Sequence, residues 1–420
     1  MIKIRQKFVK KRITESLKFK ILAIYPISLL LLALVTTPPT SIISGYQKIL
    51  FSNDLLITDY FGVANLGATL FNAGLLGILA LLLIKLEHTR LTGINVAAVF
   101  TVIGFAMFGK NILNVLPIIL GVKLYAYYQQ EPFNKFIIIA LFSTALAPLV
   151  SQSAYIFGAS PSGILIASLI GLVAGFITPP IATHLLSTHQ GFNLYNLGFT
   201  AGLIGTLAMS LFRSYGIENE AQLIWTSQYT STMRIFLILF FASLILISYI
   251  LNNNSFSRLK KLWTRSGRIA TDFVIRDTFP VTLANMGLMG LIYLALLSLI
   301  NSPLNGPTIG GLLTIVGFSA FGKHPFNTLP IVLGVLLGSF IKIWQITDPG
   351  FILALLFSTT LAPITGVFGK LKGLIAGLLH LSIVMNVGYL HGGLNLYNNG
   401  LAGGLVAIML FPLLDALKKE

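Results

Sequence analysis

The chain has 420 residues, of which 55% are apolar and only 10% are charged. A soluble globular domain usually carries about a quarter charged residues, so this composition excludes that class and predicts an integral membrane protein. The absence of cysteine excludes disulfides, thiolate metal sites and cysteine nucleophiles. The net charge of +16 does not by itself indicate a nucleic-acid partner, because basic residues of membrane proteins gather at cytoplasmic ends.

Apolar segments of roughly membrane-spanning length follow one another along the chain in two sets of seven. A basic N-terminus at residues 1–20 precedes the first half, residues 21–233. The second half, residues 234–420, contains a leading segment, a basic linker at 252–279 and six further segments. We therefore predict an all-α integral membrane protein with segments at 21–36, 61–84, 91–108, 116–129, 136–157, 162–186, 193–212, 234–251, 280–300, 309–321, 329–347, 350–368, 371–388 and 394–414.

The positions of the basic residues predict the orientation of the chain. With a cytoplasmic N-terminus, 21 of the 28 lysines and arginines fall on the inside, mainly in the N-terminus and the linker. This distribution follows the positive-inside rule and predicts a multi-pass protein of a bacterial inner membrane with both termini in the cytoplasm. Anionic lipid headgroups then account for the basic charge, so membrane lipids are expected partners and nucleic acid is not.

An internal repeat links the two halves. Three blocks recur in the same order: TVIGFAMFGKNILNVLPIILG at 101–121 returns at 314–334 as TIVGFSAFGKHPFNTLPIVLG with 12 identities in 21 positions, ALFSTALAP at 140–148 returns at 355–363 as LLFSTTLAP, and HQGFNLYNLGFTAGLI at 189–204 returns at 391–406 as HGGLNLYNNGLAGGLV. Because each half has an odd number of segments, the two copies are predicted to enter the membrane from opposite sides. In proteins with such inverted repeats, the functional site lies at the interface of the repeats.

The repeated FGK block interrupts an apolar stretch in each half. Glycine frees the backbone at the break, proline is expected in the first turn of the following helix, and asparagine suits its N-cap. The predicted helix-break residues are Gly109, Pro117, Gly322 and Pro330. Asn114 and Asn327 are predicted to cap the following helices and to belong, with the lysines, to the substrate-binding site. Non-helical backbone at membrane depth is tolerated only inside protein or along a cavity. We therefore predict two re-entrant or broken helices beside a cavity, and the sequence leaves open whether each block crosses the membrane fully.

A lysine stands at each break, Lys110 in the first half and Lys323 in the second. A charged side chain at the bilayer centre costs about 2.5–3.5 kcal/mol on the translocon scale, so a matched pair indicates a function. Together with exposed amides of helix N-termini, the two lysines are expected to form an electropositive site for an anionic or strongly polar solute. In the alternative interpretation, each lysine extends to its own membrane interface or caps helix carbonyls.

The NLYN block begins the last segment of each half and supplies amides and a phenol that can hydrogen-bond a solute. Its candidate substrate-binding residues are Asn193, Tyr195, Asn196, Asn395, Tyr397 and Asn398. Helix capping and close packing of the glycines that follow are an alternative role that needs no ligand. In the FST block, hydroxyl groups precede a proline and are expected to satisfy the carbonyls that it frees.

The acidic residues all fall in predicted loops or at segment ends, so none is expected at the membrane centre. Proton relays usually employ buried carboxylates, and proton coupling through aspartate or glutamate is therefore disfavoured. Coupling to protons through histidine, or to sodium ions bound by backbone carbonyls, stays open. We expect no cofactor and no metal site.

The leucine-proline pairs and the tyrosine-asparagine pairs in the duplicated halves resemble those of urea transporters, in which two inverted halves carry a leucine-proline element and a tyrosine-asparagine helix start. Over its whole length the chain is similar to an uncharacterised bacterial family of polytopic membrane proteins. That resemblance implies no particular substrate.

We therefore expect a transporter that moves a small polar solute, preferably an anion, by alternating access between the two repeats. A passive channel for such a solute is the alternative. An intramembrane enzyme or lipid-handling protein ranks lower, because the chain lacks the HExxH and GxSxG motifs, and no enzymatic activity is expected. The leading segments carry no repeated polar motif and are expected to serve as scaffold or as contacts of a homo-oligomer.

Overall fold

A computed structural model describes residues 13–158, 160–252, 255–268 and 271–417. Over these residues the chain is helical, and its one β-bridge pairs Thr58 with Ile224. Ten helices are long and apolar enough to cross a membrane, and four further apolar helices are shorter. This architecture agrees with the predicted all-α membrane protein. The first 12 residues of the predicted basic N-terminus, and Lys418 and Lys419, lie outside the described residues.

The two halves contain equivalent helices in the same order. The first half comprises α1 (Glu15–Thr36), α2 (Pro39–Leu50), α3 (Tyr60–Val63), α4 (Leu66–Leu86), α5 (Gly93–Phe105), α6 (Ile112–Tyr128), α7 (Ile137–Ser143), α8 (Ala147–Ile156), α9 (Pro161–His189) and α10 (Asn196–Ser214). The second comprises α11 (Thr230–Leu251), α12 (Leu259–Leu262), α13 (Phe273–Arg276), α14 (Phe279–Leu299), α15 (Gly306–Phe318), α16 (Pro325–Ile341), α17 (Pro349–Phe357), α18 (Ala362–Phe368), α19 (Lys370–His391) and α20 (Asn398–Ala416). Every apolar segment predicted from the sequence contains a helix, whereas α2, α12 and α13 were not predicted.

A short 3-10 turn separates α7 from α8, and another separates α17 from α18. Both turns begin within the FST block, at Thr144 and at Ser358. The hydroxyl of Thr144 donates to the carbonyl of Leu141 at 2.5 Å, and the hydroxyl of Thr359 donates to that of Leu356 at 2.7 Å. The accepting carbonyls lie three residues before each threonine. They are not the carbonyls of Thr144 and Thr359 that Pro148 and Pro363 would free, so the role expected for these hydroxyls is not the one observed.

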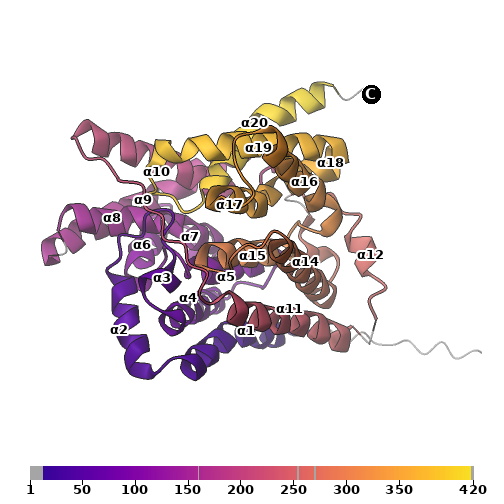
Figure 1. The fold of residues 1–420 in the computed structure, drawn as a ribbon, viewed down its shortest axis with the longest axis horizontal. Helices are drawn as coiled ribbons and strands as arrows, with labels where there is room; N and C mark the ends of the chain where they lie inside the picture. The colour runs from indigo at the N-terminus through magenta and orange to yellow at the C-terminus, as the bar shows by residue number, and fades with distance from the viewer. Residues whose placement is uncertain (1–12, 159, 253–254, 269–270, 418–420) are drawn as a thin grey trace, which may run out of the picture.

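Helices α5 and α15 lie side by side in the middle of the molecule, between the leading helices α1 and α11 and the pair α10 and α20 (Figure 1). They run antiparallel and in very close contact. A Cβ atom on Gly93, the first residue of α5, would lie 2.1 Å from the carbonyl oxygen of Ala320, just beyond α15. At the other end, a Cβ on Gly306 would lie 2.2 Å from the carbonyl oxygen of Met107. Small residues therefore set the distance between the halves at their centre.

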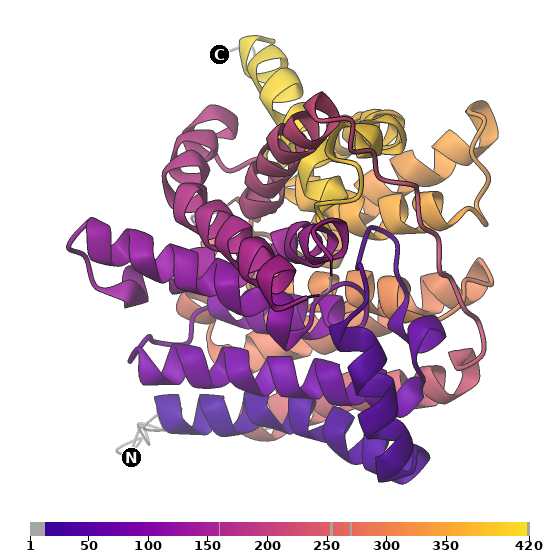
Figure 2. The same cartoon turned by 90° about the vertical axis from the view of Figure 1, so that its left-hand side faces the viewer.

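The starts of α10 and α20 form a second contact between the halves. A Cβ on Gly198 would lie 2.9 Å from the Cα of Gly400, and the reciprocal distance is 2.6 Å. These two glycines occupy the same position of the NLYNxG repeat, so the contact joins equivalent points of the two halves. Figure 2 shows α20, in yellow, at the edge opposite to the indigo leading helix α1.

Each half also caps the central helix of the other half. Asp59, the N-cap residue of α3, accepts a hydrogen bond at 3.0 Å from the backbone N–H of Gly306 at the start of α15. Asp272, the N-cap residue of α13, accepts bonds at 3.0 and 2.8 Å from the N–H of Gly93 at the start of α5. Negative charge is favourable at a helix N-terminus, so this exchange of caps holds the two halves together.

Substitution of Gly400 by alanine is expected to destabilise the contact between the halves. The added Cβ would lie 2.6 Å from the backbone Cα of Gly198, and overpacking of this kind costs about 1–3 kcal/mol. Gly388→Ala is the matched control, because the nearest atom to its added Cβ lies 3.9 Å away. Thermal unfolding in detergent checks the prediction. Equal melting temperatures for the two variants would contradict it.

Candidate functional site

The two lysines of the FGK blocks bond across the interface between the halves. Lys110 Nζ donates to the hydroxyl of Tyr397 at 2.6 Å. Lys323 Nζ donates to the hydroxyl of Tyr195, and also to that of Thr359 at 2.8 Å. The lysine of each half is therefore held by the tyrosine of the other half's NLYN block. Both lysines are completely buried, so they do not extend to a membrane interface as in the alternative interpretation.

Aromatic rings surround both ammonium groups. Lys110 Nζ lies 4.7 Å from the ring centroid of Tyr397 and 5.2 Å from that of Phe105. Lys323 Nζ lies 4.3 Å from the centroid of Tyr195 and 5.1 Å from that of Phe318. Ring faces attract cations, but the described residues place no carboxylate in an ion pair with either lysine. The two buried lysines thus lack a negative partner within the described part of the chain.

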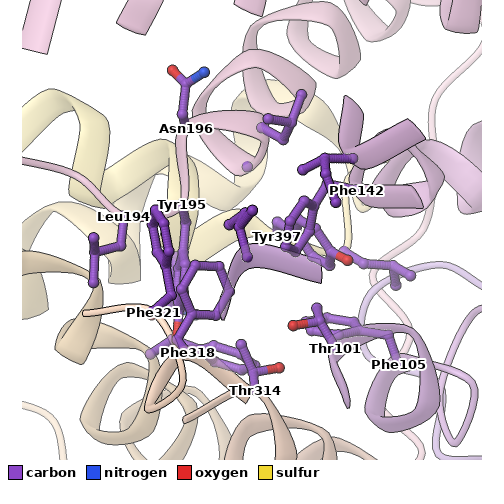
Figure 3. A pocket seen from close by; sticks show the side chains of 18 of the residues that line it. Thr101, Phe105, Phe142, Leu194, Tyr195, Asn196, Thr314, Phe318, Phe321 and Tyr397 are labelled. Atoms are coloured by element: carbon purple, nitrogen blue, oxygen red, sulfur yellow. The ribbon is translucent and has the colours of Figure 1, made fainter. Parts of the chain in front are cut away.

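A cavity of about 150 Å³ lies between the two halves. Its walls are mostly aromatic and aliphatic, and equivalent residues of the two halves contribute to it, as Figure 3 shows. These equivalent pairs are Thr101 and Thr314, Phe105 and Phe318, Phe142 and Phe357, Leu194 and Leu396, Tyr195 and Tyr397, and Gly198 and Gly400. The lysines lie behind the tyrosines that line the cavity. The hydroxyl of Thr101, which is 1% exposed, has no hydrogen-bond partner, so the cavity wall retains an unused polar group.

A buried asparagine fixes each FGK turn. The amide nitrogen of Asn72, on α4, donates to the carbonyls of Ala106 and Lys110, both at 2.7 Å. The amide nitrogen of Asn285, on α14, donates to the carbonyls of Ser319 and Lys323, both at 2.8 Å. These bonds satisfy carbonyls where the helical ladder stops and hold the backbone that carries each lysine.

The helices after the FGK turns begin earlier than predicted. The N-cap residues are Asn111 and His324, and the expected caps Asn114 and Asn327 instead occupy the third helical position. There each closes a capping box, with its side-chain oxygen accepting from the N–H of the N-cap residue at 2.9 Å. The expectation that Asn114 and Asn327 are the N-cap residues is therefore wrong, although an asparagine, Asn111, does cap α6.

The other predicted features of the break are met only in part. Pro117 and Pro330 lie inside α6 and α16 rather than in the first turn, because each helix starts several residues before its proline. Gly109 has a φ of +105°, a conformation that favours glycine. Gly322 does not have a positive φ, so the glycine is conformationally required in the first half alone.

The asparagines of the NLYN blocks bond mainly to other groups of the protein, and most of them do not line the cavity. The Asn193 amide nitrogen donates to the carbonyl of Gly400 in the other half at 3.2 Å. The oxygens of Asn196 and Asn398 each bond a histidine of the preceding helix, His189 and His391, at 2.9 Å. Asn395 accepts from the N–H of Tyr397 at 2.9 Å, and its amide nitrogen has no partner. Of these four, Asn196 alone lines the central cavity.

Comparison with known proteins gives one match. The family described as "Protein of unknown function (DUF1576)" matches residues 38–214 and 251–416. The chain belongs to this family. The two matched stretches fall in the two halves and omit nearly all of the leading helices α1 and α11. No curated protein and no solved structure matches the chain, so the resemblance to urea transporters receives no support from these comparisons.

Sequence reasoning missed several residues of the site, although some left a signal. The aromatic pairs Phe105 and Phe318, and Phe142 and Phe357, are identical between the repeats, but identical apolar residues in membrane helices are easily attributed to packing. The two turn-holding asparagines lie in a further repeated pattern, TLFNAG at 69–74 and TLANMG at 282–287. Asp54 and Asp59, assigned to exposed loops from the sequence, are fully buried. Neither aspartate lies in one of the three repeated blocks, so the repeat gave no indication of their burial.

Substitution of Asn72 by leucine is expected to destabilise the first FGK turn. The carbonyls of Ala106 and Lys110 would both lose their donor, and an unsatisfied buried polar group costs about 1–3 kcal/mol. Asn285→Leu is expected to have a similar effect in the second half. The exposed Asn386 provides the control, since its substitution by leucine is expected to change stability by no more than about 0.5 kcal/mol. Denaturation with SDS in mixed micelles measures the free energy of unfolding of all three variants. A loss of stability for Asn386→Leu as large as that for Asn72→Leu would contradict the prediction.

Proposed function

We propose that the protein is a transporter that moves a small anionic solute across the cell membrane by alternating access. In this proposal the two halves are inverted-topology repeats of seven segments each, with a central site between them. The shorter helices α5, α6, α15 and α16 supply the re-entrant elements, and both termini lie in the cytoplasm. The observation that carries the proposal is the crossed pairing of Lys110 with Tyr397 and of Lys323 with Tyr195 around a shared cavity.

The electrostatics of the site favour an anion. An ionised ammonium group removed from water is costly unless it is paired, and neither lysine has a carboxylate partner among the described residues. The tyrosine hydroxyls satisfy hydrogen bonds but supply no negative charge. A bound anion would supply it, with Tyr195 and Tyr397 as the groups that contact the solute and the lysines as the source of the positive potential.

The size and walls of the cavity favour an organic anion with an apolar body. A dry apolar cavity of about 150 Å³ is large enough for a benzene-sized molecule, and the cavity here has that volume. The phenyl rings of Phe105 and Phe318 and the rings of both tyrosines line it. The hydroxyls of Thr101 and Thr314 are the polar groups on the wall opposite the tyrosine motifs. A small sulfonate or carboxylate on an apolar frame matches this combination.

The two lysine-tyrosine pairs suit a pair of gates. Each pair links the FGK turn of one half to the NLYN block of the other, so separation of the halves at one end breaks one pair and leaves the other in place. Both pairs are formed in this structure. Alternate breaking of the two pairs would open the cavity first to one side and then to the other. Helices that pack through glycine, as α5 does with α15 and α10 with α20, can shift against each other as closely packed units.

A passive channel for the same solute is the second candidate. The contribution of equivalent residues to the cavity wall also fits a pore that runs between the halves. The two mechanisms differ in kinetics, because a carrier saturates and exchanges internal for external solute, whereas a channel does not show counterflow.

Uptake into proteoliposomes tests the proposal. The solutes are radiolabelled benzenesulfonate, methanesulfonate and phosphate as anions, with benzamide and urea as neutral counterparts. We expect saturable uptake and counterflow of an organic anion, with benzenesulfonate preferred to benzamide. Replacement of both Lys110 and Lys323 by methionine is expected to reduce anion uptake at least tenfold, which corresponds to about 1.4 kcal/mol.

Lys123→Met is the matched control, because Lys123 is exposed and its loss should leave uptake unchanged. Thermal unfolding of each variant in detergent separates loss of transport from loss of fold. Uptake of neutral solutes that survives the loss of both lysines would overturn the anion site. Anion flux without saturation or counterflow would favour the channel.

A further inference from the structure

Asp54 is a completely buried carboxylate beside the first FGK turn. It lies in the connection between α2 and α3 and is 0% exposed. Its carboxylate accepts hydrogen bonds from the amide nitrogens of Asn111 at 3.1 Å and Asn114 at 3.0 Å. Asn111 directly follows Lys110 in the chain, and Asn114 also donates to the carbonyl of Gly109 at 3.1 Å. The carboxylate therefore braces the turn that carries Lys110.

All of the hydrogen bonds that the structure gives to Asp54 come from side chains. The remaining two donors are the hydroxyls of Tyr60 at 2.6 Å and Ser151 at 2.7 Å. A hydroxyl group can rotate from donor to acceptor, so these partners can accommodate either a carboxylate or a carboxylic acid. Asp59, the other fully buried aspartate, differs in this respect, because it accepts from the backbone N–H groups of Phe61, Thr226 and Gly306. Asp54 can change protonation state without loss of a backbone cap.

The second half lacks this carboxylate. Gly267 occupies the equivalent place, five residues before the cap residue Asp272, as Asp54 stands five residues before Asp59. The structure supports this equivalence of Gly267 with Asp54. A Cβ on Gly267 would lie 2.5 Å from the amide nitrogen of Asn327, the counterpart of Asn114. It would also lie 2.2 Å from the carbonyl oxygen of Gly322, which leaves no room for a side chain. The Lys110 turn alone is therefore braced by a buried carboxylate, whereas the Lys323 turn is followed by the neutral-or-cationic ring of His324, whose Nε2 lies 2.8 Å from the carbonyl oxygen of Arg265.

We propose that Asp54 binds the proton that accompanies the anion, which makes the protein a proton-anion symporter with one proton-sensitive gate. The inference rests on the proposed transport function and adds its coupling ion. Asp54 takes up one proton from the side where the Lys110 gate opens and releases it on the other side. With one monovalent anion and one proton, the cycle moves no net charge.

Protonation changes the hydrogen bonding that holds the gate. The ionised carboxylate accepts four bonds, whereas a carboxylic acid must donate its own O–H and accepts less strongly. The bonds to Asn111 and Asn114 then weaken, and the turn that carries Lys110 is released. The Lys110–Tyr397 pair can separate in that state, while the Lys323–Tyr195 gate has no such brace.

The surroundings of Asp54 allow it to titrate near neutral pH. Burial raises the pKa of its carboxyl to about 7, although hydrogen bonds from Tyr60, Ser151 and Asn114 oppose this rise. Tyr60, from α3, is the titratable side chain that contacts it, and the facing groups from α6 and α8 are neutral amides and a hydroxyl. Lys48 on α2 is exposed. The described residues place no basic side chain in an ion pair with Asp54.

The test measures uptake of radiolabelled benzenesulfonate into proteoliposomes with and without an imposed pH gradient. This anion stays ionised, so it does not leak across the bilayer as a neutral acid. With one proton per anion and one pH unit across the membrane, the wild type should accumulate the probe up to about tenfold. Asp54→Asn, which resembles the protonated state, should still perform counterflow but reach no accumulation.

Ser151→Ala tests the same site without removal of the carboxyl. Loss of a donor to the carboxylate raises its pKa, so the pH midpoint of gradient-free uptake should move to higher pH, a shift that a purely structural role would not produce. Glu220→Gln, at an exposed carboxylate, should leave both measurements unchanged.

The outcomes separate the two proposals. Gradient-driven accumulation in Asp54→Asn equal to that of the wild type would overturn the proton site and leave the transporter. Counterflow in the wild type without any accumulation under an imposed pH gradient would do the same. Absence of uptake of every anion by the folded wild type would overturn the transport function itself, and the proton site with it.

Discussion

Two lysine side chains buried among aromatic rings impose the strongest constraint on this molecule. An ammonium group in a low-dielectric interior needs hydrogen-bond acceptors and a compensating charge. Lys110 finds its acceptor in the opposite half, at Tyr397, and Lys323 has one acceptor in the opposite half, Tyr195, and one in its own half, Thr359. The bonds to the two tyrosines therefore link the halves to each other.

The rest of the architecture serves this exchange between the halves. Glycine at the contacts of α5 with α15 and of α10 with α20 brings the backbones close enough for each lysine to reach across. Asp59 and Asp272 cap the central helix of the other half in the same reciprocal manner. The cavity lies where these contacts converge and is lined by equivalent residues. The halves differ chemically at Asp54, whose equivalent position in the second half is Gly267, and at the N-cap after the FGK turn, which is Asn111 in the first half and His324 in the second.

The repeat in the sequence allowed much of the helix order and the importance of the lysine and tyrosine motifs to be predicted. It did not reveal that each lysine bonds the tyrosine of the other half, because a repeat identifies equivalent residues and not the partners they meet when the halves pack. The helix caps were misplaced because α6 was expected to start near Pro117, whereas the capping box of Asn111 and Asn114 starts it earlier. Asp54 was assigned to an exposed loop because its burial depends on contacts with α6 and α8 that lie far away in the sequence.

Alternating access in this protein depends on the opposite orientation of the two halves in the membrane. Cysteine labelling tests this orientation directly because the chain has no native cysteine. Gln130 follows α6 and Gln345 follows α16, at equivalent ends of the repeats, and both are exposed. Single variants Gln130→Cys and Gln345→Cys are treated with a membrane-impermeant maleimide in intact cells and in inside-out vesicles. Inverted repeats predict that Gln345→Cys reacts from outside the cell and Gln130→Cys reacts only from the cytoplasmic side. Reaction of both cysteines from the same side would contradict the inverted arrangement and the alternating-access site built on it.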